Sequence, residues 1–277
     1  MIVKYIQKDM RVYNPEGSAL RNNQLAQLEV LKDFAEICKK HDINWWICSG
    51  TLLGAARHGG FIPWDDDIDV SMLKKDYRKL RKILQNMDSD EYFFQCIQTD
   101  PDHINPFGVF RRKKGEVSST DPRAVYFKYK GVGIDVFYIE KCSRFSSHLS
   151  KFFYRNILHE TQKIKNATLR HTLIRVGQAI NFGLLFPIVR LVGLINPKNK
   201  YHYPHGSGFY EEPFYIKNIF PLTTIEFEGV TFPAPGDTDA HLTAMYGDWR
   251  KIPSEDQIKK SLHSPEYINE IFGKDNV

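Results

Sequence analysis

The sequence predicts an α+β (mixed α/β) fold, in which a mixed β-sheet is flanked by helices and interrupted by a helical insertion. Three observations predict it. Short apolar strands alternate with amphipathic helices through the first half of the chain. Residues 145–195 contain almost no turn-forming residues except Pro187, which indicates two long helices. From residue 203 onward the chain returns to short strands and loops rich in proline, glycine and aromatic residues.

The first predicted element is an amphipathic helix over 24–40. Its apolar residues recur at helical spacing, as Leu25, Leu28, Leu31, Ala35 and Cys38. Asn22 or Asn23 is expected to cap it. A short apolar strand over 44–49 follows, and then a helix over 51–58 that Gly59 and Gly60 end.

The remaining elements complete a sheet and define three segments. Strands are predicted at 67–73, 92–98, 107–112 and 133–138, with an amphipathic helix at 75–87. We therefore predict a catalytic core over 1–144, a helical insertion over 145–202, and a C-terminal segment over 203–277 that packs back on the core.

Composition narrows the class of protein. With 277 residues, 42% hydrophobic and 26% charged, the chain resembles an ordinary soluble globular protein. Its four cysteines lack Cys-x-x-Cys spacing, so neither a disulfide framework nor a zinc site is expected. Cys38 and Cys48 lie in apolar runs and are expected to be buried free thiols. There is no signal-peptide pattern and no uncharged apolar run of about 18 residues, so a cytoplasmic protein without a spanning helix is expected. The net charge of +5 is mild, and no nucleic-acid partner is expected.

The stretch Trp64-Asp-Asp-Asp-Ile-Asp-Val70 is the strongest chemical signal. It places four carboxylates within five residues, a cluster that repels itself unless cations compensate. In a strand, Asp65, Asp67 and Asp69 would share one face. Their oxygens suit Mg²⁺ or Mn²⁺. A solvated acidic loop would explain Asp65 and Asp66. It would not explain why Asp67 and Asp69 alternate with apolar residues.

A second strand supplies a further carboxylate. Asp135 lies between apolar residues in 131–137, and alone it would suit a cap or an ion pair. Together with Asp67 and Asp69 it provides the third carboxylate of a two-metal phosphoryl-transfer site. We therefore predict that these three residues are metal ligands and catalytic, and that Asp135 can accept the acceptor's proton.

A strand-to-helix junction lies just upstream of this stretch. A small residue at Gly50, followed by Thr51 and a helix N-terminus, would let the backbone approach a phosphate. A Gly-Thr turn alone has little specificity, and its weight comes from its position before the acidic strand. Arg57 suits either a phosphate contact or a surface ion pair.

In this order, the motifs resemble the nucleotidyltransferase superfamily of DNA polymerase beta, and residues 49–70 resemble the signature of the LicD family. Residues 227–235 and 246–253 are also similar to LicD segments. The resemblance implies a nucleotidyltransferase-like core with metal at Asp67, Asp69 and Asp135. It further implies a phosphate-binding turn at Gly50-Thr51. Substrate-binding positions implied at or beside the signature are Arg57, Trp64 and Asp65.

The same resemblance implies an activity. Bacterial members of this family transfer phosphocholine to surface glycans, and fukutin-type members transfer ribitol phosphate. The expected reaction is transfer of phosphocholine, or a similar head group, from a CDP-activated donor to a glycan or lipid-linked glycan, such as lipopolysaccharide or teichoic acid. An aromatic cage would suit choline, but ethanolamine, aminoethylphosphonate and polyol phosphates stay open.

Two other functions compete with this one. A glycosyltransferase also binds metal and nucleotide sugar through Asp-x-Asp, and a membrane-associated scaffold could be built around 145–195. That stretch joins a basic segment to the apolar run 181–195, which suits peripheral contact with the inner face of a membrane or, alternatively, a core helix. Residues 111–114, Arg-Arg-Lys-Lys, suit a solvated turn more than a phosphate-guiding patch.

Overall fold

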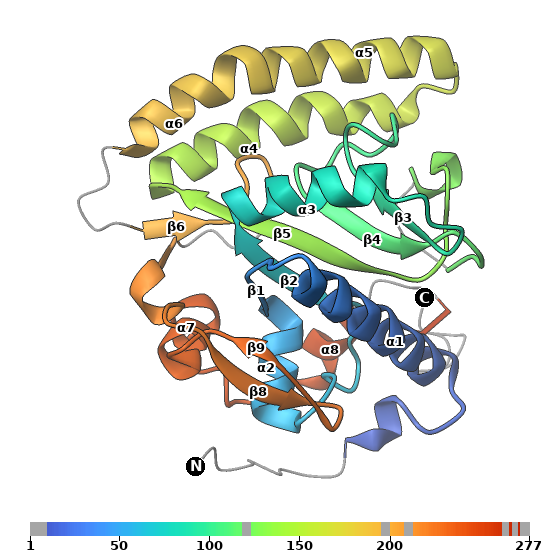
Figure 1. Cartoon of the computed structure of the whole chain (residues 1–277), viewed down its shortest axis with the longest axis vertical. Coiled ribbons are helices and arrows are strands. Elements are labelled where there is room, and N and C mark those ends of the chain that lie inside the picture. The colour runs from blue at the N-terminus through green and yellow to red at the C-terminus, as the bar shows by residue number, and fades with distance from the viewer. Residues whose placement is uncertain are drawn as a thin grey trace.

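The computed structural model describes residues 10–117, 123–194, 200–207, 213–261, 266, 267 and 271. These residues form a mixed sheet, helices packed against it, a separate β-hairpin and a layer of long helices (Figure 1). The predicted α+β class with a mixed sheet is confirmed.

The central path of the sheet runs β1-β2-β5-β4-β3. Its strands are β1 Trp45–Ile47, β2 Asp69–Leu73, β5 Gly133–Lys141, β4 Gly108–Arg112 and β3 Tyr92–Gln95. Strands β2 and β5 are parallel, and the other neighbours on this path are antiparallel. Beyond it, β6 (Lys200–His202) pairs with the end of β5 and with β7 (Phe214–Tyr215). A separate hairpin joins β8 (Thr223–Phe227) to β9 (Val230–Ala234).

The helices fall into two groups. The core and C-terminal helices are α1 Ala19–Lys40, α2 Ser49–His58, α3 Lys74–Asn86, α7 Thr238–Tyr246 and α8 Glu255–Ser261. The long-helix layer contains α4 Arg144–His159, α5 Ala167–Ile180 and α6 Phe186–Leu194, and a π-helical turn over Asn181–Leu185 makes α5 and α6 continuous. Short 3₁₀ turns lie at Arg11–Tyr13, Ala124–Tyr126, Glu160–Lys163 and Ile216–Asn218.

Helix α1 differs from its prediction at its start and on its buried face. It begins earlier, after Ser18, whose hydroxyl accepts the Arg21 N–H at 3.1 Å, so the predicted asparagine caps are wrong. Leu25, expected to face the core, is 36% exposed. Polar side chains of this helix are buried instead, and their partners lie in the acidic stretch described below.

Strands β2 and β5 carry two different cores because their side chains alternate between faces. Val70 and Val136 belong to the core that also contains the buried residues of α1 and α3. Phe137 belongs to the opposite core, with Tyr203 and Phe214 from the C-terminal part. The alternation places Asp69 and Asp135 on this second face.

The long-helix layer has its own small core, which contains Tyr154, Leu158, Ile174 and Phe186. The expectation that no helix is long enough to span a membrane is wrong by length and composition. The apolar run 181–195 continues α5, so Ala167–Gly193 forms one apolar helical stretch of 27 residues. A third of its most apolar window is buried against the rest of the protein.

All four cysteines are buried free thiols, which confirms the expectation for Cys38 and Cys48. Burial raises the pKa of Cys142 to about 11, so this thiol stays protonated at neutral pH.

Candidate active site

Asp69 and Asp135 lie side by side where the parallel pairing of β2 with β5 begins. The two residues are register partners, and the Asp135 N–H donates to the Ile68 carbonyl at 2.8 Å. The Asp69 N–H donates to the Thr51 hydroxyl at 2.8 Å, and the Asp69 carbonyl accepts from the Cys48 N–H at 3.0 Å. Thr51, predicted to bind phosphate, therefore holds the start of β2 against the first turn of α2.

The electrostatic environment of Asp69 is strongly unfavourable for a carboxylate. Its side chain is only 9% exposed. Burial raises its pKa well above the ordinary value, and the negative charges of Asp67, Asp135 and Asp65 raise it further. A hydrogen bond from Ser49 opposes the shift. The fold thus brings four carboxylates close enough to repel one another. A cation bound among them would relieve this repulsion.

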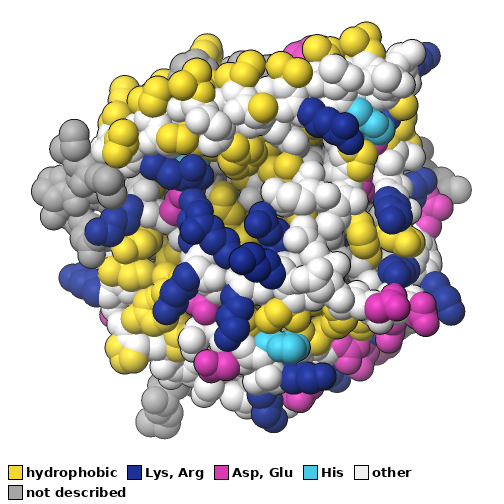
Figure 2. Space-filling view, turned by 45° about the horizontal axis from the view of Figure 1, so that its top comes forward, with side chains coloured by type: hydrophobic (Ala, Val, Ile, Leu, Met, Phe, Trp, Pro, Cys, Tyr) yellow, Lys and Arg dark blue, Asp and Glu magenta, His cyan; other side chains and the backbone are white. Residues whose placement is uncertain are grey.

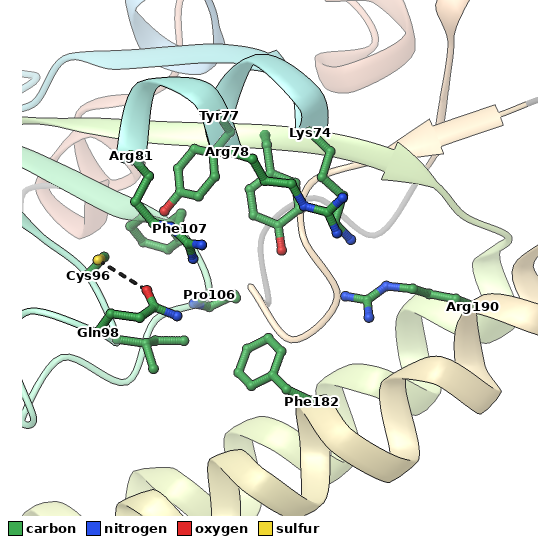
Figure 3. A pocket seen from close by; sticks show the side chains of 12 residues that line it. Lys74, Tyr77, Arg78, Arg81, Cys96, Gln98, Pro106, Phe107, Phe182 and Arg190 are labelled. Carbon is green, nitrogen blue, oxygen red and sulfur yellow. Dashed lines mark hydrogen bonds between the residues drawn. The ribbon is translucent and has the colours of Figure 1, made fainter. Parts of the chain in front are cut away.

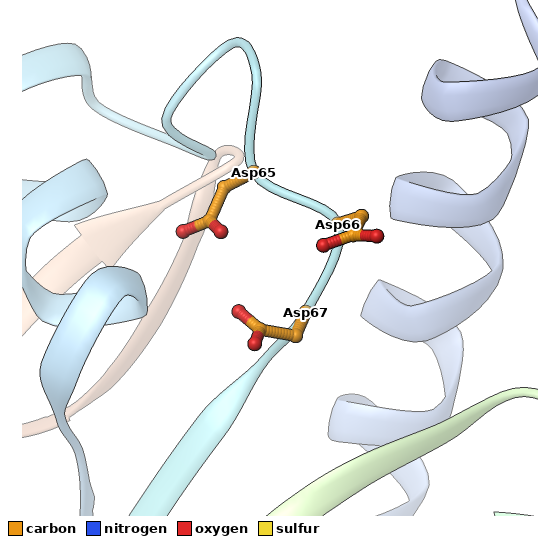
Figure 4. Close-up of side chains that lie close together, drawn as sticks. All are labelled: Asp65, Asp66 and Asp67. Atoms are coloured by element: carbon orange, nitrogen blue, oxygen red, sulfur yellow. The ribbon is translucent and has the colours of Figure 1, made fainter. Parts of the chain in front are cut away.

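The acidic stretch before Asp69 is a loop rather than a strand, because β2 begins at Asp69. The predicted alternation of Asp65 and Asp67 along a strand is therefore wrong. The loop instead gathers Asp65, Asp66 and Asp67, whose ligand oxygens can lie within 4.8 Å of one another (Figure 4). All three side chains are partly exposed.

Buried amides on α1 hold this loop. Gln24 donates to the Asp65 carbonyl at 2.8 Å, and Gln27 donates to the Asp66 carbonyl at 2.6 Å. Asn23 donates to the Asp66 carbonyl as well, at 3.1 Å. These carbonyls lie before the start of β2 and have no strand partner, so side-chain donors satisfy them. Sequence reasoning missed all three amides, although polar residues interrupting an apolar helix face were a visible signal.

Gly50 lies directly beneath Asp65. A Cβ atom added to Gly50 would come within 2.5 Å of the Asp65 Oδ2 atom. The missing side chain at the N-terminus of α2 therefore makes room for a carboxylate of the protein itself. Negative charge is favoured at this end of a helix.

Ser49 is a site residue that sequence reasoning did not select. It adopts φ of 50°, in the left-handed region that non-glycine residues rarely occupy. Its hydroxyl contacts the Tyr203 hydroxyl at 2.9 Å and also hydrogen-bonds Asp69. This contact joins the C-terminal part of the chain to the carboxylates.

The side chains of Arg57 and Trp64 are buried and pack against other parts of the protein. Arg57 is 7% exposed and donates to the carbonyls of Trp249 and Lys251 at 3.0 and 3.2 Å. Burial lowers its pKa to about 10. Trp64 is 5% exposed and lies edge-on to Tyr13. Arg57 therefore does not form the surface ion pair considered above. Its hydrogen bonds connect the C-terminal segment to α2.

The tip of the β8–β9 hairpin is fastened to the same region. The Glu228 carboxylate accepts from Arg21 of α1 at 2.8 Å and from the Phe61 N–H at 3.1 Å. The C-terminal hairpin, α1 and the loop after α2 therefore meet just before the acidic stretch.

Arg111 brings a positive charge to the other side of Asp135. Its guanidinium donates to Gln95 Oε1 at 3.0 Å and to the Gly131 carbonyl at 2.8 Å. Burial lowers its pKa, while the charges of Asp135 and Asp100 oppose that shift. Arg111 is thus a half-buried cation next to the carboxylates, which the expectation of a solvated turn did not anticipate.

The tryptophans do not form an open aromatic cage. Each is at most 6% exposed, and their rings contribute to the cores of the protein: Trp45, Trp46, Trp64 and Trp249. A quaternary ammonium group would therefore need other partners at this site.

Comparison with known proteins gives one family and a graded set of relatives. Residues 42–169 match the family described as LicD/FKTN/FKRP, nucleotidyltransferase domain. The lipopolysaccharide cholinephosphotransferase LicD of Haemophilus influenzae is 27% identical, over 91% of this chain and 97% of its own length. The ribitol 5-phosphate transferase FKRP of Homo sapiens is 50% identical over 34 residues, which are 12% of this chain and 7% of that protein. An uncharacterized protein of Rickettsia prowazekii, RP689, is 43% identical over 24% of this chain and 26% of its own length.

Proposed function

Because residues 42–169 match the nucleotidyltransferase domain of the LicD/FKTN/FKRP family, we propose that this protein is a transferase that moves a phosphate-bearing head group onto a glycan. The donor is CDP-activated, the head group is phosphocholine or a similar group, and the acceptor is a hydroxyl of a cell-surface glycan or its lipid-linked precursor. The pairing of Asp69 with Asp135 beside Asp67 and Asp65 is the observation that carries this proposal.

The residues present fit a divalent cation. The donors are all carboxylate oxygens, the ligands that Mg²⁺ and Mn²⁺ prefer. Burial raises the pKa of Asp69 well above its ordinary range, and repulsion from the neighbouring carboxylates raises it further. Asp67, Asp69 and Asp135 would hold the metal. When bound, it would neutralise charge on the phosphates of the donor.

The proposed reaction is a displacement at phosphorus. The acceptor hydroxyl oxygen forms a bond to the phosphorus that carries the head group, and the bond from that phosphorus to CMP breaks. CMP leaves with the electron pair, and the hydroxyl proton passes to a carboxylate of the protein. We assign that proton to Asp135, which is only partly buried.

Other residues prepare this site rather than react. Gln24 and Gln27 fix the backbone of the acidic loop, and Thr51 fixes the start of β2. Arg111 places positive charge beside Asp135, where the phosphates of a donor would add negative charge. Preorganised groups of this kind need no rearrangement during the reaction.

The experiment offers the purified protein and a glycan acceptor four donors: CDP-choline, CDP-ethanolamine, CDP-ribitol and a UDP-sugar, each with Mg²⁺ or Mn²⁺. Release of CMP with phosphorylated glycan supports the proposal, and glycosyl transfer from the UDP-sugar overturns it. Asp135→Asn should still bind the donor but lose turnover. If donor binding falls as far as turnover, Asp135 is structural and the assigned proton acceptor is wrong.

A further inference from the structure

The continuous helix formed by α5, the π turn and α6 carries an exposed apolar stripe. Its members recur every three or four residues, so they share one side of the helix. Each is 41–66% exposed: Leu169, Leu173, Val176, Ile180, Leu184, Ile188 and Leu191. Figure 2 shows hydrophobic side chains along the upper edge of the molecule, where α5 and α6 lie. A stripe of this length is uncommon on a surface that meets only water.

The opposite side of this helix is fixed to the protein. A Cβ atom on Gly177 would meet the Leu158 side chain of α4 at 2.6 Å. Phe186 is fully buried beside Tyr154. Arg170 is buried and donates to Asp102 at 2.6 Å. Crossing a membrane would dismantle this packing and expose a buried ion pair to lipid. The helix is therefore suited to lie along an interface.

A cationic pocket lies beside the stripe, with a volume of about 240 Å³. Lys74, Arg78 and Arg81 enter it from α3, while Phe182 and Arg190 enter from the helix that carries the stripe (Figure 3). Figure 2 shows Lys and Arg side chains gathered below the hydrophobic row.

Part of this positive charge is not neutralised within the protein. Lys74 and Arg190 both pair with Glu140. Among the residues that the structure describes, no ion pair involves Arg78 or Arg81, and the Arg81 Nε atom is buried without a hydrogen-bond partner. Arg78 and Arg81 therefore keep positive charge at the pocket, available to an anion that enters it.

The long-helix layer as a whole is also basic. Residues 144–194 contain eight Lys and Arg residues and one acidic residue, Glu160. A second copy of the chain would bring the same positive charge to this face and would be repelled. An anionic lipid surface offers both partners that this face lacks, because it has phosphate oxygens at its surface and hydrocarbon beneath.

We propose that this face docks on an anionic lipid bilayer. The stripe of α5 and α6 enters the boundary between head groups and acyl chains, and the cations of the pocket contact lipid phosphates. This goes beyond the transfer reaction, and it would bring the protein to the surface on which a lipid-linked acceptor resides.

The test is co-sedimentation of the full chain with vesicles of phosphatidylcholine alone or mixed in equal parts with phosphatidylglycerol. Binding is expected to the mixed vesicles and to weaken at high salt. Leu173→Glu and Leu184→Glu should each weaken binding at least about tenfold, equal to about 1.4 kcal/mol. Arg78→Glu should weaken it about tenfold or more. Val12→Glu is the matched control, since Val12 is 72% exposed but outside the stripe, and it should bind like the wild type.

Thermal unfolding of each variant shows that a loss of binding is not a loss of fold. Asp67→Asn should bind vesicles normally, so a failure of the transferase proposal is distinguishable from a failure of docking. The inference is overturned if the wild type does not bind the mixed vesicles at low salt, or if the stripe variants bind them as strongly as the wild type does. It is also overturned if those variants only convert a dimer to a monomer in light scattering, because the stripe is then a contact between copies.

Discussion

Asp69 and Asp135 lie side by side as register partners on adjacent parallel strands, although they are 66 positions apart in the sequence. Asp67, two residues upstream of Asp69, and Asp65 add their charges to the same field. A parallel pair of strands needs a long crossover connection. That connection contains α3, β3 and β4, so the central pair of the candidate site exists only when the sheet is complete.

Replacing a single carboxylate should separate metal binding from folding. Asp67→Asn or Asp69→Asn is expected to reduce transfer more than about 100-fold, since loss of an outer-sphere partner alone typically costs about 10–100-fold. The thermal midpoint should hold or rise, because one like charge leaves a crowded cluster. The measurements are turnover in Mg²⁺ and Mn²⁺ and thermal unfolding without metal.

Asp88→Asn is the matched control, because Asp88 is an exposed aspartate outside the acidic loop. We expect it to retain transfer within about tenfold. Near-normal turnover of Asp67→Asn would contradict the metal assignment.

Gly50→Ala should affect activity more than folding. The new methyl group would collide with Asp65 Oδ2 and push that carboxylate off the start of α2. Alanine otherwise favours a helix by roughly 1 kcal/mol over glycine. We expect transfer to fall at least about tenfold while the thermal midpoint changes little. Gly183→Ala is the control, since a Cβ there meets nothing within 4 Å, and its activity should be unchanged. Equal activity of the two variants would show that the position of Asp65 is unimportant.

Gln27→Leu should loosen the acidic loop. Leucine keeps the volume of glutamine but leaves the Asp66 carbonyl with one donor fewer. Asn23 still donates to that carbonyl, so the loss is one hydrogen bond of about 0.5–1.5 kcal/mol, and the midpoint of urea unfolding should fall. Metal affinity, measured by calorimetry, should fall about 10–100-fold. Asn22→Leu, on the exposed side of α1, should change neither quantity. If only stability changes in Gln27→Leu, the amide supports the fold but not the site.

Glu140 should make stability depend on pH. Burial alone would raise its pKa, but His205, Lys74 and Arg190 together hold it well below the ordinary 4.5. A carboxyl with a lowered folded pKa stabilises the protein above its unfolded pKa, and that contribution is lost as pH falls through the folded value. Urea unfolding should therefore show stability falling below about pH 4.5.

Glu140→Gln provides the comparison for that prediction. It should cost about 3 kcal/mol at neutral pH and flatten the acid dependence, because it leaves the partly buried Lys74 and Arg190 without their carboxylate. Glu160→Gln is the control, since its pair with Lys163 is exposed on both sides, and it should stay within about 0.5 kcal/mol of the wild type. An unchanged acid dependence in Glu140→Gln would place the titrating group elsewhere.

Local patterns in the sequence determined the elements and their chemistry. Strands and helices follow from the spacing of apolar residues, and the order of the Gly-Thr turn, acidic stretch and third aspartate could be read directly. The burial of Cys38 and Cys48 also followed from their apolar neighbours. These features depend on residues close together in the chain, so periodicity and composition are sufficient to find them.

Only the tertiary structure decided which partners those residues meet. The buried amides of α1 became visible as supports when the carbonyls of the acidic loop were seen to lack strand partners. Arg57 proved to be buried because the C-terminal segment folds over α2. The stripe on α5 and α6 is apolar in any conformation, but its exposure depends on which side packs against α4. Contacts between distant segments leave no periodic pattern in the sequence. The sequence alone therefore determined which residues can form the site, and packing determined how they are arranged.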